Sequence, residues 1–301
     1  MKKLKKNPTY QNIFERIGHF FKKIFLIVLR KCTSDEIYIR VRFLLQYNRL
    51  INLKKPDTFF AKINWLKLYD RNPFYTQLVD KYEVRQHIKE KIGKEYLIPL
   101  LGIYENVEEI NFNSLPNSFV LKATHGAAWN IICHNKSEFD INKSKKVMNS
   151  WLKSNFYELW GEYVYKNVAP RLICEELLSN ENEPSLIDYK FHCFHGLPTY
   201  IQIDRNRFQN HTLDFYDLEW NRLPFGLWFP PSSNSIPKPE PLVKMIELAK
   251  ILSAEFNYIR VDFYVVKDKI YFGELTFYPC NGFGVFYPSS KDYEFGKLLK
   301  L

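Results

Sequence analysis

The stretch that most constrains the fold of this chain is RVDFY at residues 260–264, which is followed by GELT at 273–276. Apolar and polar residues alternate through both segments, as they do in strands that bury one face. We predict two strands, 259–266 and 270–277, joined by a three-residue turn at 267–269. The chain is therefore expected to contain an antiparallel hairpin near its C-terminal end.

This hairpin brings two acidic side chains together. With a three-residue turn, Asp262 lies opposite Glu274, and Arg260 lies opposite Thr276 on the same face. Facing carboxylates repel each other, so the arrangement favours a cation between them, and oxygen ligands of this kind suit Mg²⁺ held together with substrate phosphates. A two-residue turn would instead shift the register by one residue and send Glu274 to the opposite face, leaving an ordinary hairpin with two solvated acids.

Composition limits the choice of partner. Aromatic residues are frequent in this 301-residue chain, with 20 Tyr and 25 Phe, so it is globular and long enough for more than one lobe. The net charge of +10 gathers partly near the N-terminus, and no zinc-finger or RNA-recognition motif is present, so we expect no nucleic-acid partner. The five cysteines are scattered without a CxxC pair, which favours a reducing compartment.

The N-terminal segment has its own pattern. Apolar residues recur at helical spacing between residues 13 and 28, with basic residues on the other face, and we predict a basic amphipathic helix over 1–32. Its longest apolar run, 24–29, is far shorter than the roughly 20 residues that span a bilayer. The helix either packs on the protein's own core or lies in a membrane interface. Its basic face favours peripheral contact of residues 1–31 with an anionic membrane.

The remaining pattern mixes helices with antiparallel strands, which indicates an α/β or α+β protein with more than one lobe. A Pro- and Ser-rich loop at 230–241 precedes the last long helix, and Thr58 is a suitable N-cap. Helices are predicted at 34–50, 58–69, 78–92, 143–157 and 242–256, and strands at 96–104, 118–123, 171–177, 188–194 and 199–203.

A lysine and a small-residue turn suggest a phosphate site. Lys122 ends an apolar strand, and the turn 124–128 follows it directly, with His125 and Gly126 inside it. Such a turn can bring backbone amides close to a phosphate. Taken singly, a strand lysine is more often a surface residue with a buried aliphatic stem, and a loop histidine is more often structural.

Two further strands carry candidate nucleotide-binding residues. Lys190 shares a strand face with Asp188, since residues two apart point to the same side. Glu175, Glu176 and Leu177 close another apolar strand, where hinge backbone and a carboxylate can meet an adenine or a ribose. Each of these features is weak alone, and their order along the chain is what matters.

In that order, the features resemble the ATP-grasp superfamily, and more narrowly its teichuronopeptide-biosynthesis (TupA-like) type, found with bacterial surface-polysaccharide genes. The resemblance covers about residues 55–300 and implies an ATP-grasp fold, in which antiparallel sheets of two lobes clasp a nucleotide, with a helical N-terminal region. It places the protein in the bacterial cytoplasm. The basic N-terminal helix, which lies outside the resemblance, favours peripheral contact at the inner face of the membrane. The matching stretches are 59–65, 80–82 with Arg85, 119–126, 188–191, 260–264 and 273–277. The implied domains are 1–32, 33–114, 115–180 and 181–301, the last carrying the metal site.

The resemblance also implies an activity and its cofactors, ATP and Mg²⁺. The expected enzyme is a carboxylate–amine ligase that forms an amide through an acyl phosphate and releases ADP and phosphate. It would join an amine donor to a saccharide or uronic-acid-type acceptor of a bacterial surface polysaccharide or its precursor. Open alternatives are a kinase that uses the same site, a glycosyltransferase-like enzyme that uses a nucleotide sugar, and a scaffold without turnover.

The roles that the resemblance assigns are specific. Lys122 and Lys190 would hold the ATP phosphates, with His125, Gly126 and Asp188 nearby, and Glu175, Glu176 and Leu177 would form the adenine hinge. Asp262 and Glu274 would carry the metal, with Thr276 where many ATP-grasp enzymes have asparagine. Arg260 and Lys190 are the expected catalytic residues, since Arg260 would steady the transferred phosphoryl group. Apart from the resemblance, Arg205 and Arg207, after the strand 199–203, are either clamps for a carboxylate or phosphate of the acceptor or solvated loop residues.

Overall fold

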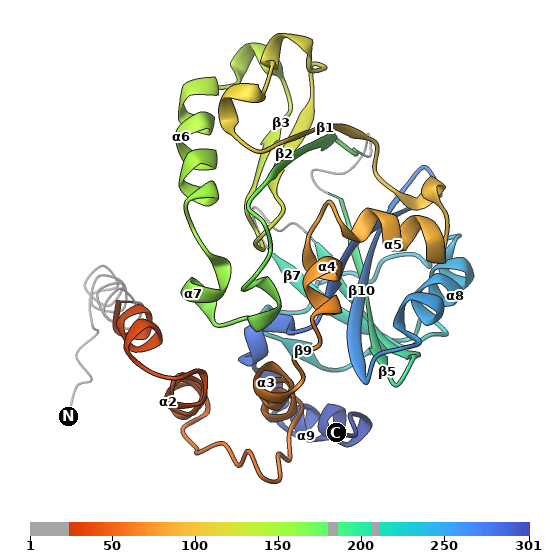
Figure 1. The fold of residues 1–301 in the computed structure, drawn as a ribbon. Helices are drawn as coiled ribbons and strands as arrows, with labels where there is room; N and C mark the ends of the chain where they lie inside the picture. Colours follow the sequence, from red (N-terminus) through yellow and green to blue (C-terminus); the bar gives the residue numbers. More distant parts are fainter. Residues whose placement is uncertain (1–23, 180–185, 206–210) are drawn as a thin grey trace, which may run out of the picture.

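The computed structural model describes residues 24–179, 186–205 and 211–301 (Figure 1). Its helices are α2 (Asp35–Tyr47), α3 (Phe59–Tyr69), α4 (Phe74–Val79), α5 (Val84–Lys91), α6 (Ile141–Leu152), α7 (Phe156–Trp160), α8 (Leu242–Ser253) and α9 (Ser290–Leu298). Its strands are β1 (Leu100–Tyr104), β2 (Phe119–Ala123), β3 (Asn130–Cys133), β4 (Leu172–Glu176), β5 (Asp188–Phe194), β6 (Leu197–Arg205), β7 (Thr212–Tyr216), β8 (Arg222–Leu223), β9 (Gly226–Leu227), β10 (Tyr258–Val266), β11 (Lys269–Thr276) and β12 (Phe286–Tyr287).

The larger sheet is antiparallel, with strand order β11-β10-β5-β6-β7-β8. Alternation in β5 and β10 gives this sheet two different faces. Phe191 and Val261 are paired neighbours without solvent exposure, and they belong to a core that includes the apolar side of α8. Their sequence neighbours Lys190 and Asp262 are also paired and buried, and they point to the opposite, polar face. A sheet that buries ionised groups on one face needs a function or a compensating network there.

The smaller sheet is also antiparallel, with order β1-β4-β2-β3, and it stands with α6 above the larger sheet (Figure 1). Leu121 and Cys174 are paired across β2 and β4 and pack into a core with Met148 of α6. Lys122 and Glu175 therefore point away from that core. Two sheets thus present charged side chains on their inner faces.

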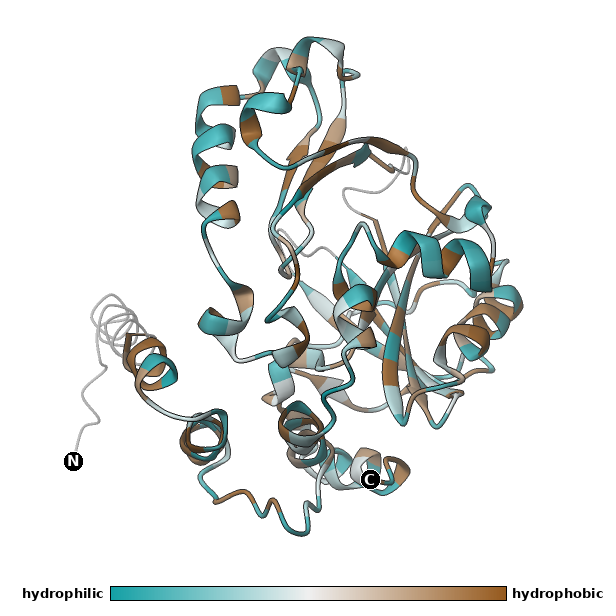
Figure 2. Ribbon diagram, viewed as in Figure 1, coloured by the Kyte–Doolittle hydropathy of each residue, from teal (hydrophilic) through white to brown (hydrophobic). Residues whose placement is uncertain are grey.

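The N-terminal helices lie to one side of the two sheets (Figure 1). The predicted amphipathic helix falls largely on residues 1–23, outside the described part of the chain, and only its end at 24–32 is seen as helix. In Figure 2 this stretch of helix carries hydrophobic residues beside hydrophilic ones. Ile24, Phe25 and Val28 are exposed, and Arg30 attaches the stretch to the body through a 2.8 Å ion pair with Asp35. None of the helices in the described ranges is long and apolar enough to cross a membrane.

The β10–β11 hairpin confirms the predicted pairing by an unexpected route. Asp262 lies opposite Glu274, and Arg260 lies opposite Thr276. The three-residue turn is wrong, because the turn is made by Lys267 and Asp268 alone. A bulge between Asp262 and Phe263 takes up the extra residue and restores the register.

Gly273 is the residue that the bulge leaves over, since Phe263 pairs with Phe272 and Asp262 pairs with Glu274. A Cβ at this position would lie 3.1 Å from the carbonyl oxygen of Asp262. Only a residue without a side chain fits this close approach without a shift of the neighbouring strand. The bulge at Gly273 therefore places Glu274 on the same face as Asp262.

Both residues of the turn have positive φ, 49° at Lys267 and 61° at Asp268. An L-residue with positive φ carries a steric clash of about 1–2 kcal/mol, which glycine avoids. Glycine also has more conformational freedom in the unfolded chain, and this offsets part of the gain. We therefore expect Asp268→Gly to raise the free energy of unfolding by about 0.5 kcal/mol. Urea denaturation measures this change. Glu219→Gly, in a turn residue without positive φ, is the control and is expected to lower stability. A loss of stability in Asp268→Gly would contradict the turn geometry.

Candidate active site

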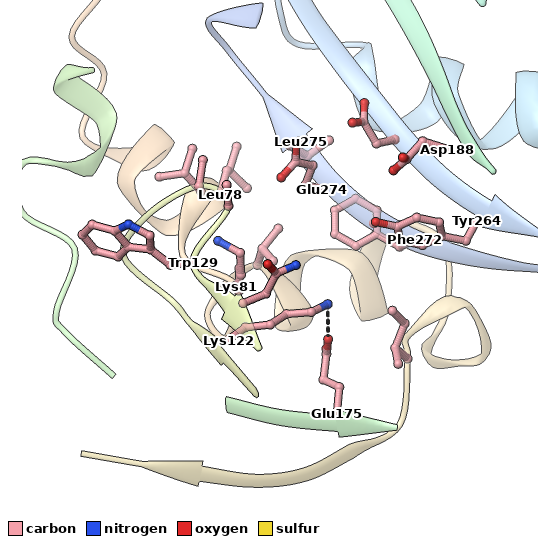
Figure 3. Close-up of a pocket in the computed structure, with 18 of the residues that line it drawn as sticks. Leu78, Lys81, Lys122, Trp129, Glu175, Asp188, Tyr264, Phe272, Glu274 and Leu275 are labelled. Carbon is pink, nitrogen blue, oxygen red and sulfur yellow. Dashed lines mark hydrogen bonds and ion pairs between the residues drawn. The ribbon is translucent and has the colours of Figure 1, made fainter. Parts of the chain in front are cut away.

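A cavity of about 580 Å³ lies between the inner faces of the two sheets (Figure 3). Lys81 and Lys122 reach into it from one side, and Glu274 and Asp188 face them from the larger sheet. The other lining residues are Leu78, Val79, Val84, Arg85, Leu97, Ile98, Ala127, Ala128, Trp129, Asn130, Tyr165, Glu175, His211, Phe229, Asp262, Tyr264, Phe272, Gly273 and Leu275. The predicted residues Lys122, Glu175, Asp188, Asp262 and Glu274 are thus brought to one cavity.

Glu175 organises the basic side of the cavity. Its carboxylate accepts from the Lys122 ammonium at 2.7 Å and from the Arg85 guanidinium at 2.9 Å. Arg85 also donates to the carbonyl of Ile98 at 2.8 Å. Glu175 is 5% exposed, so its charge is compensated by these two cations and not by water. The pair of cations is thereby fixed in place at the wall of the cavity.

Lys81 also lines the cavity. The predicted continuous helix 78–92 gave no indication of this position. That helix is broken between α4 and α5, because the Asp80 carboxylate accepts from the backbone N–H groups of Tyr82 and Glu83, at 2.8 and 3.2 Å. Lys81 therefore lies in the break, and its ammonium donates to the carbonyl of Gly126. Burial lowers the pKa of Lys81, although the carboxylate of Glu274 acts in the opposite direction. Lys81 is thus close to the acidic side of the cavity.

Arg260 lies between the two facing carboxylates. Its guanidinium donates twice to Asp262, at 2.7 Å each, and once to Glu274, at 3.2 Å. It also donates to the Thr276 hydroxyl at 3.0 Å, and that hydroxyl in turn donates to Glu274. The repulsion expected from the hairpin pattern is therefore relieved by a side chain of the same hairpin.

The two carboxylates differ in their surroundings. Burial raises the pKa of Asp262 to about 6, in spite of Arg260 and Lys190. Burial acts in the same direction on Glu274, but the charges of Arg260, Lys81 and Lys190 outweigh it and lower the pKa of Glu274. The side chain of Glu274 is 43% exposed and that of Asp262 only 5%. Glu274 is therefore the accessible acid of the pair and the one that stays ionised to lower pH.

Asp262, Glu274 and Thr276 supply oxygen atoms of the type that Mg²⁺ prefers. Within the described ranges, no group of three or more His, Cys, Asp and Glu side chains could hold a metal ion by itself. Two carboxylates with one hydroxyl fit Mg²⁺ where substrate phosphates complete the coordination, which is the usual arrangement for this ion. The residues present therefore fit a metal that arrives with a phosphorylated ligand.

Lys190 forms a second layer beside this cluster. Its ammonium lies 2.8 Å from a carboxylate oxygen of Asp204 on β6, and both side chains are at least nine-tenths buried. The Gln202 amide donates to the same carboxylate at 2.8 Å. Lys190 pairs with Asp262 across β5 and β10, so its positive charge lies next to the hairpin cluster without lining the cavity.

Several predicted cofactor-binding residues do not line the cavity. The His125 imidazole is buried and shares a hydrogen bond of 2.9 Å with the Trp151 carbonyl, and Gly126 offers its carbonyl to Lys81. Glu176 is exposed and pairs with Phe119, and Leu177 follows the end of β4. The binding roles assigned to His125, Gly126, Glu176 and Leu177 remain predictions.

Only one of the two arginines expected to hold the acceptor lies in the described part of the chain. Arg207 lies outside the described residues. Arg205 donates to the carbonyl of Asn234 at 2.7 Å and lies 4.0 Å from the carboxylate of Asp214. Its guanidinium thus fixes the loop after β9 against β7.

An apolar slot completes the cavity. Its apolar lining residues include Tyr264 of β10, Phe272 and Leu275 of β11, and Leu97 and Ile98. Such a slot suits a flat aromatic ring such as a nucleobase. Tyr264 was not among the predicted site residues. The sequence could have indicated it, because alternation along β10 places Tyr264 on the same face as Asp262.

This geometry agrees with the outcome of sequence comparison. The profile of the family described as TupA-like ATPgrasp matches residues 61–300. This chain belongs to the TupA-like ATP-grasp family. The expected ATP-grasp fold, with antiparallel sheets and a helical N-terminal region, is confirmed. Among curated proteins, none matches this chain.

Solved structures resemble the TupA-like chain at low sequence identity. D-alanine–D-alanine ligase from Bacillus anthracis is 17% identical, with a TM-score of 0.39 over 66% of this chain and 56% of the ligase. Phosphoribosylamine–glycine ligase from Thermotoga maritima is 13% identical, with a TM-score of 0.40 over 67% and 48%. The ATP-grasp ligase PsnB, solved with Mg and ADP, is 11% identical, with a TM-score of 0.40 over 72% and 57%. The chain spans about half the length of these structures.

Proposed function

We propose that this TupA-like ATP-grasp protein is an ATP-dependent ligase that joins a carboxylate to an amine. The observation that carries the proposal is a single cavity with Lys81 and Lys122 on one side and the Arg260–Asp262–Glu274 cluster of the larger sheet on the other. Phosphoryl transfer requires positioning and charge neutralisation more than a nucleophilic side chain, and these residues supply both. The solved ligases named above include one with Mg and ADP, which supports ATP and Mg²⁺ as cofactors here.

Each part of the cavity then has a role. The apolar slot between Tyr264 and Ile98 takes the adenine, and Lys81 and Lys122 neutralise the phosphates. Asp262, Glu274 and Thr276 would hold Mg²⁺, which neutralises charge on the transferred phosphoryl group when it is bound. Arg260 keeps Asp262 and Glu274 in register and adds a fixed positive charge beside them. Lys190, held by Asp204, extends this positive charge along the sheet.

The product of such a site is an amide formed through an acyl phosphate. ATP phosphorylates the acceptor carboxylate, the amine attacks the carbonyl carbon, and phosphate leaves. We propose a saccharide with a uronic-acid-type carboxylate as the acceptor, in a bacterial surface polysaccharide or its precursor. The family resemblance and the basic net charge of +10, which suits an anionic acceptor, support this choice.

The test is product analysis with purified protein, ATP, Mg²⁺, glucuronate oligosaccharides and a set of amino acids. A ligase releases ADP and phosphate only when both carboxylate and amine are present. Phosphate that stays on the acceptor without an amine requirement would show a kinase. Binding of UDP-sugars without binding of ATP would show a nucleotide-sugar transferase and overturn the proposal.

We also propose peripheral contact with an anionic membrane through the N-terminal segment. The exposed Ile24, Phe25 and Val28 at the end of this segment support it. Deletion of residues 1–28 is expected to abolish flotation with phosphatidylglycerol vesicles, and neutral vesicles serve as the control. The deletion keeps Arg30, which contacts the body through Asp35 and Tyr157. Flotation that survives the deletion would contradict membrane contact by this segment.

A further inference from the structure

A histidine in the cavity has no part in the function proposed so far. His211 lies directly before β7 and lines the cavity together with Asp188 and Asp262. Its Nε2 lies 2.7 Å from a carboxylate oxygen of Asp204. Its Nδ1 has no hydrogen-bond partner among the residues that the structure describes. We propose that His211, oriented by Asp204, is the base that takes the proton from the attacking amine, an inference that rests on the proposed ligase function.

The carboxylate of Asp204 fixes which ring nitrogen carries the proton. A carboxylate accepts a hydrogen bond, so Nε2 of His211 donates to it, and the neutral ring then has its lone pair on Nδ1. Phe229 holds the ring from the side, with ring centroids 3.8 Å apart and an interplanar angle of 33°. The imidazole is therefore fixed in both tautomer and orientation, as a general base requires.

Asp204 does not need His211 for its own compensation. The carboxylate already lies 2.8 Å from the Lys190 ammonium and accepts from the Gln202 amide at 2.8 Å. Gln202 is held in turn by His192, at 3.0 Å, and His192 by the hydroxyl of Tyr258, at 2.9 Å. Asp204 is thus a rigid, buried anchor, and the additional bond to an imidazole at the cavity surface is unexplained by stability alone.

The location suits the amine and not the nucleotide. Asp204 is the partner of Asp188 across β5 and β6, two strands away from the β10 hairpin strand. At the usual strand spacing this separates it from β10 by about 10 Å. The apolar slot lies on the hairpin side, on β10 and β11, so His211 lies toward the opposite end of the cavity. Lys190 is on β5, between β6 and β10. It lies 2.8 Å from Asp204 and is paired with Asp262.

The chemical step balances without another reactant. An amine nitrogen attacks the carbonyl carbon of the acyl phosphate, so that the C–N bond forms and the C–O bond to phosphate breaks. An amino acid brings an ammonium group, which gives one proton to Nδ1 of His211, and from there to water, to become the attacking amine. The second proton that the amide cannot keep leaves with the phosphate, and hydroxylamine needs only this second transfer. Phosphate leaves with the electron pair of the broken bond. A positioned base of this kind contributes about 10²–10⁴-fold to the rate.

The experiment compares two nucleophiles in wild type and His211→Gln, with ATP, Mg²⁺ and glucuronate oligosaccharides. Hydroxylamine is unprotonated at neutral pH and forms a hydroxamate without strong dependence on a base, whereas amino acids are protonated and need one. We expect amide formation to fall by about 100-fold or more in His211→Gln, and hydroxamate formation by less than about 3-fold. Asp204→Asn is expected to reproduce the loss of amide formation. His134→Gln, at an exposed histidine outside the cavity, is the control.

The outcomes separate this inference from the proposed function. Equal losses of amide and hydroxamate in His211→Gln would overturn the role of base while the ligase function stands. Weaker ATP binding by His211→Gln in calorimetry would show a nucleotide ligand instead of a base. No hydroxamate from the wild type would overturn the ligase function and, with it, this inference. Circular dichroism and ATP affinity equal to wild type establish that the variants are folded.

Discussion

Replacement of Arg260 with methionine is expected to destabilise the protein by about 3–5 kcal/mol. The guanidinium makes four hydrogen bonds to Asp262, Glu274 and Thr276, and Arg260 is only 7% exposed. Its loss leaves two carboxylates facing each other, one of them buried, without a cation between them. Removal of one partner from a buried ion pair costs far more than loss of an exposed pair. Urea denaturation at pH 8 measures the difference.

Three controls make this expectation specific. Arg40→Met removes an exposed ion pair with Glu36 and is expected to cost less than about 1 kcal/mol. Arg260→Lys keeps the positive charge but not the double hydrogen bond. Its loss in free energy of unfolding should therefore lie between those of Arg40→Met and Arg260→Met. In Arg260→Met, the pKa of Asp262 in the folded protein rises further above its value in the unfolded chain. The variant is therefore more stable at low pH, where Asp262 is protonated, and loses stability as the pH rises. The deficit of Arg260→Met should therefore shrink from pH 8 to pH 5. Similar losses in Arg260→Met and Arg40→Met would contradict this account.

The hairpin shows how far the sequence alone determines the site. Alternation and the spacing of Asp262 and Glu274 were enough to predict that the two acids share a face. The predicted turn was wrong by one residue, and the pairing held because the bulge at Gly273 offset the error. A pattern of period two cannot detect a bulge, since the residue that a bulge leaves over has no signature except its small size.

Residues from other parts of the chain were harder to predict. Lys81 was placed on a continuous helix, because the backbone hydrogen bonds to the Asp80 carboxylate that break this helix depend on local backbone geometry. His211 was not predicted at all. Its partner Asp204 lies on another strand, and a single histidine forms no motif with a recognisable spacing. The family resemblance assigned residues within the matching stretches, and it gave no information on which of them face the cavity.

Glu274→Gln is expected to weaken the binding of ATP by at least about 10-fold in the presence of Mg²⁺, which corresponds to about 1.4 kcal/mol. Glu274 is the accessible acid of the cluster, and the pKa of its carboxyl is lowered by Arg260, Lys81 and Lys190, so it is ionised at neutral pH. Glutamine keeps the shape and one oxygen but removes the negative charge that a divalent cation requires. Calorimetric titration of ATP into both proteins measures the affinities.

The dependence on metal is what makes this measurement decisive. Without Mg²⁺ the two proteins should bind ATP about equally, or the variant more tightly, because a carboxylate facing phosphates without a cation repels them. Glu247→Gln, at an exposed residue of α8 that pairs with Lys244, should behave as wild type under both conditions. Equal weakening with and without Mg²⁺ would mean that Glu274 supports the fold of the hairpin and not a metal. ATP affinity that is unchanged in Glu274→Gln, with UDP-sugars bound more tightly than ATP, would contradict the ligase function and favour a transferase.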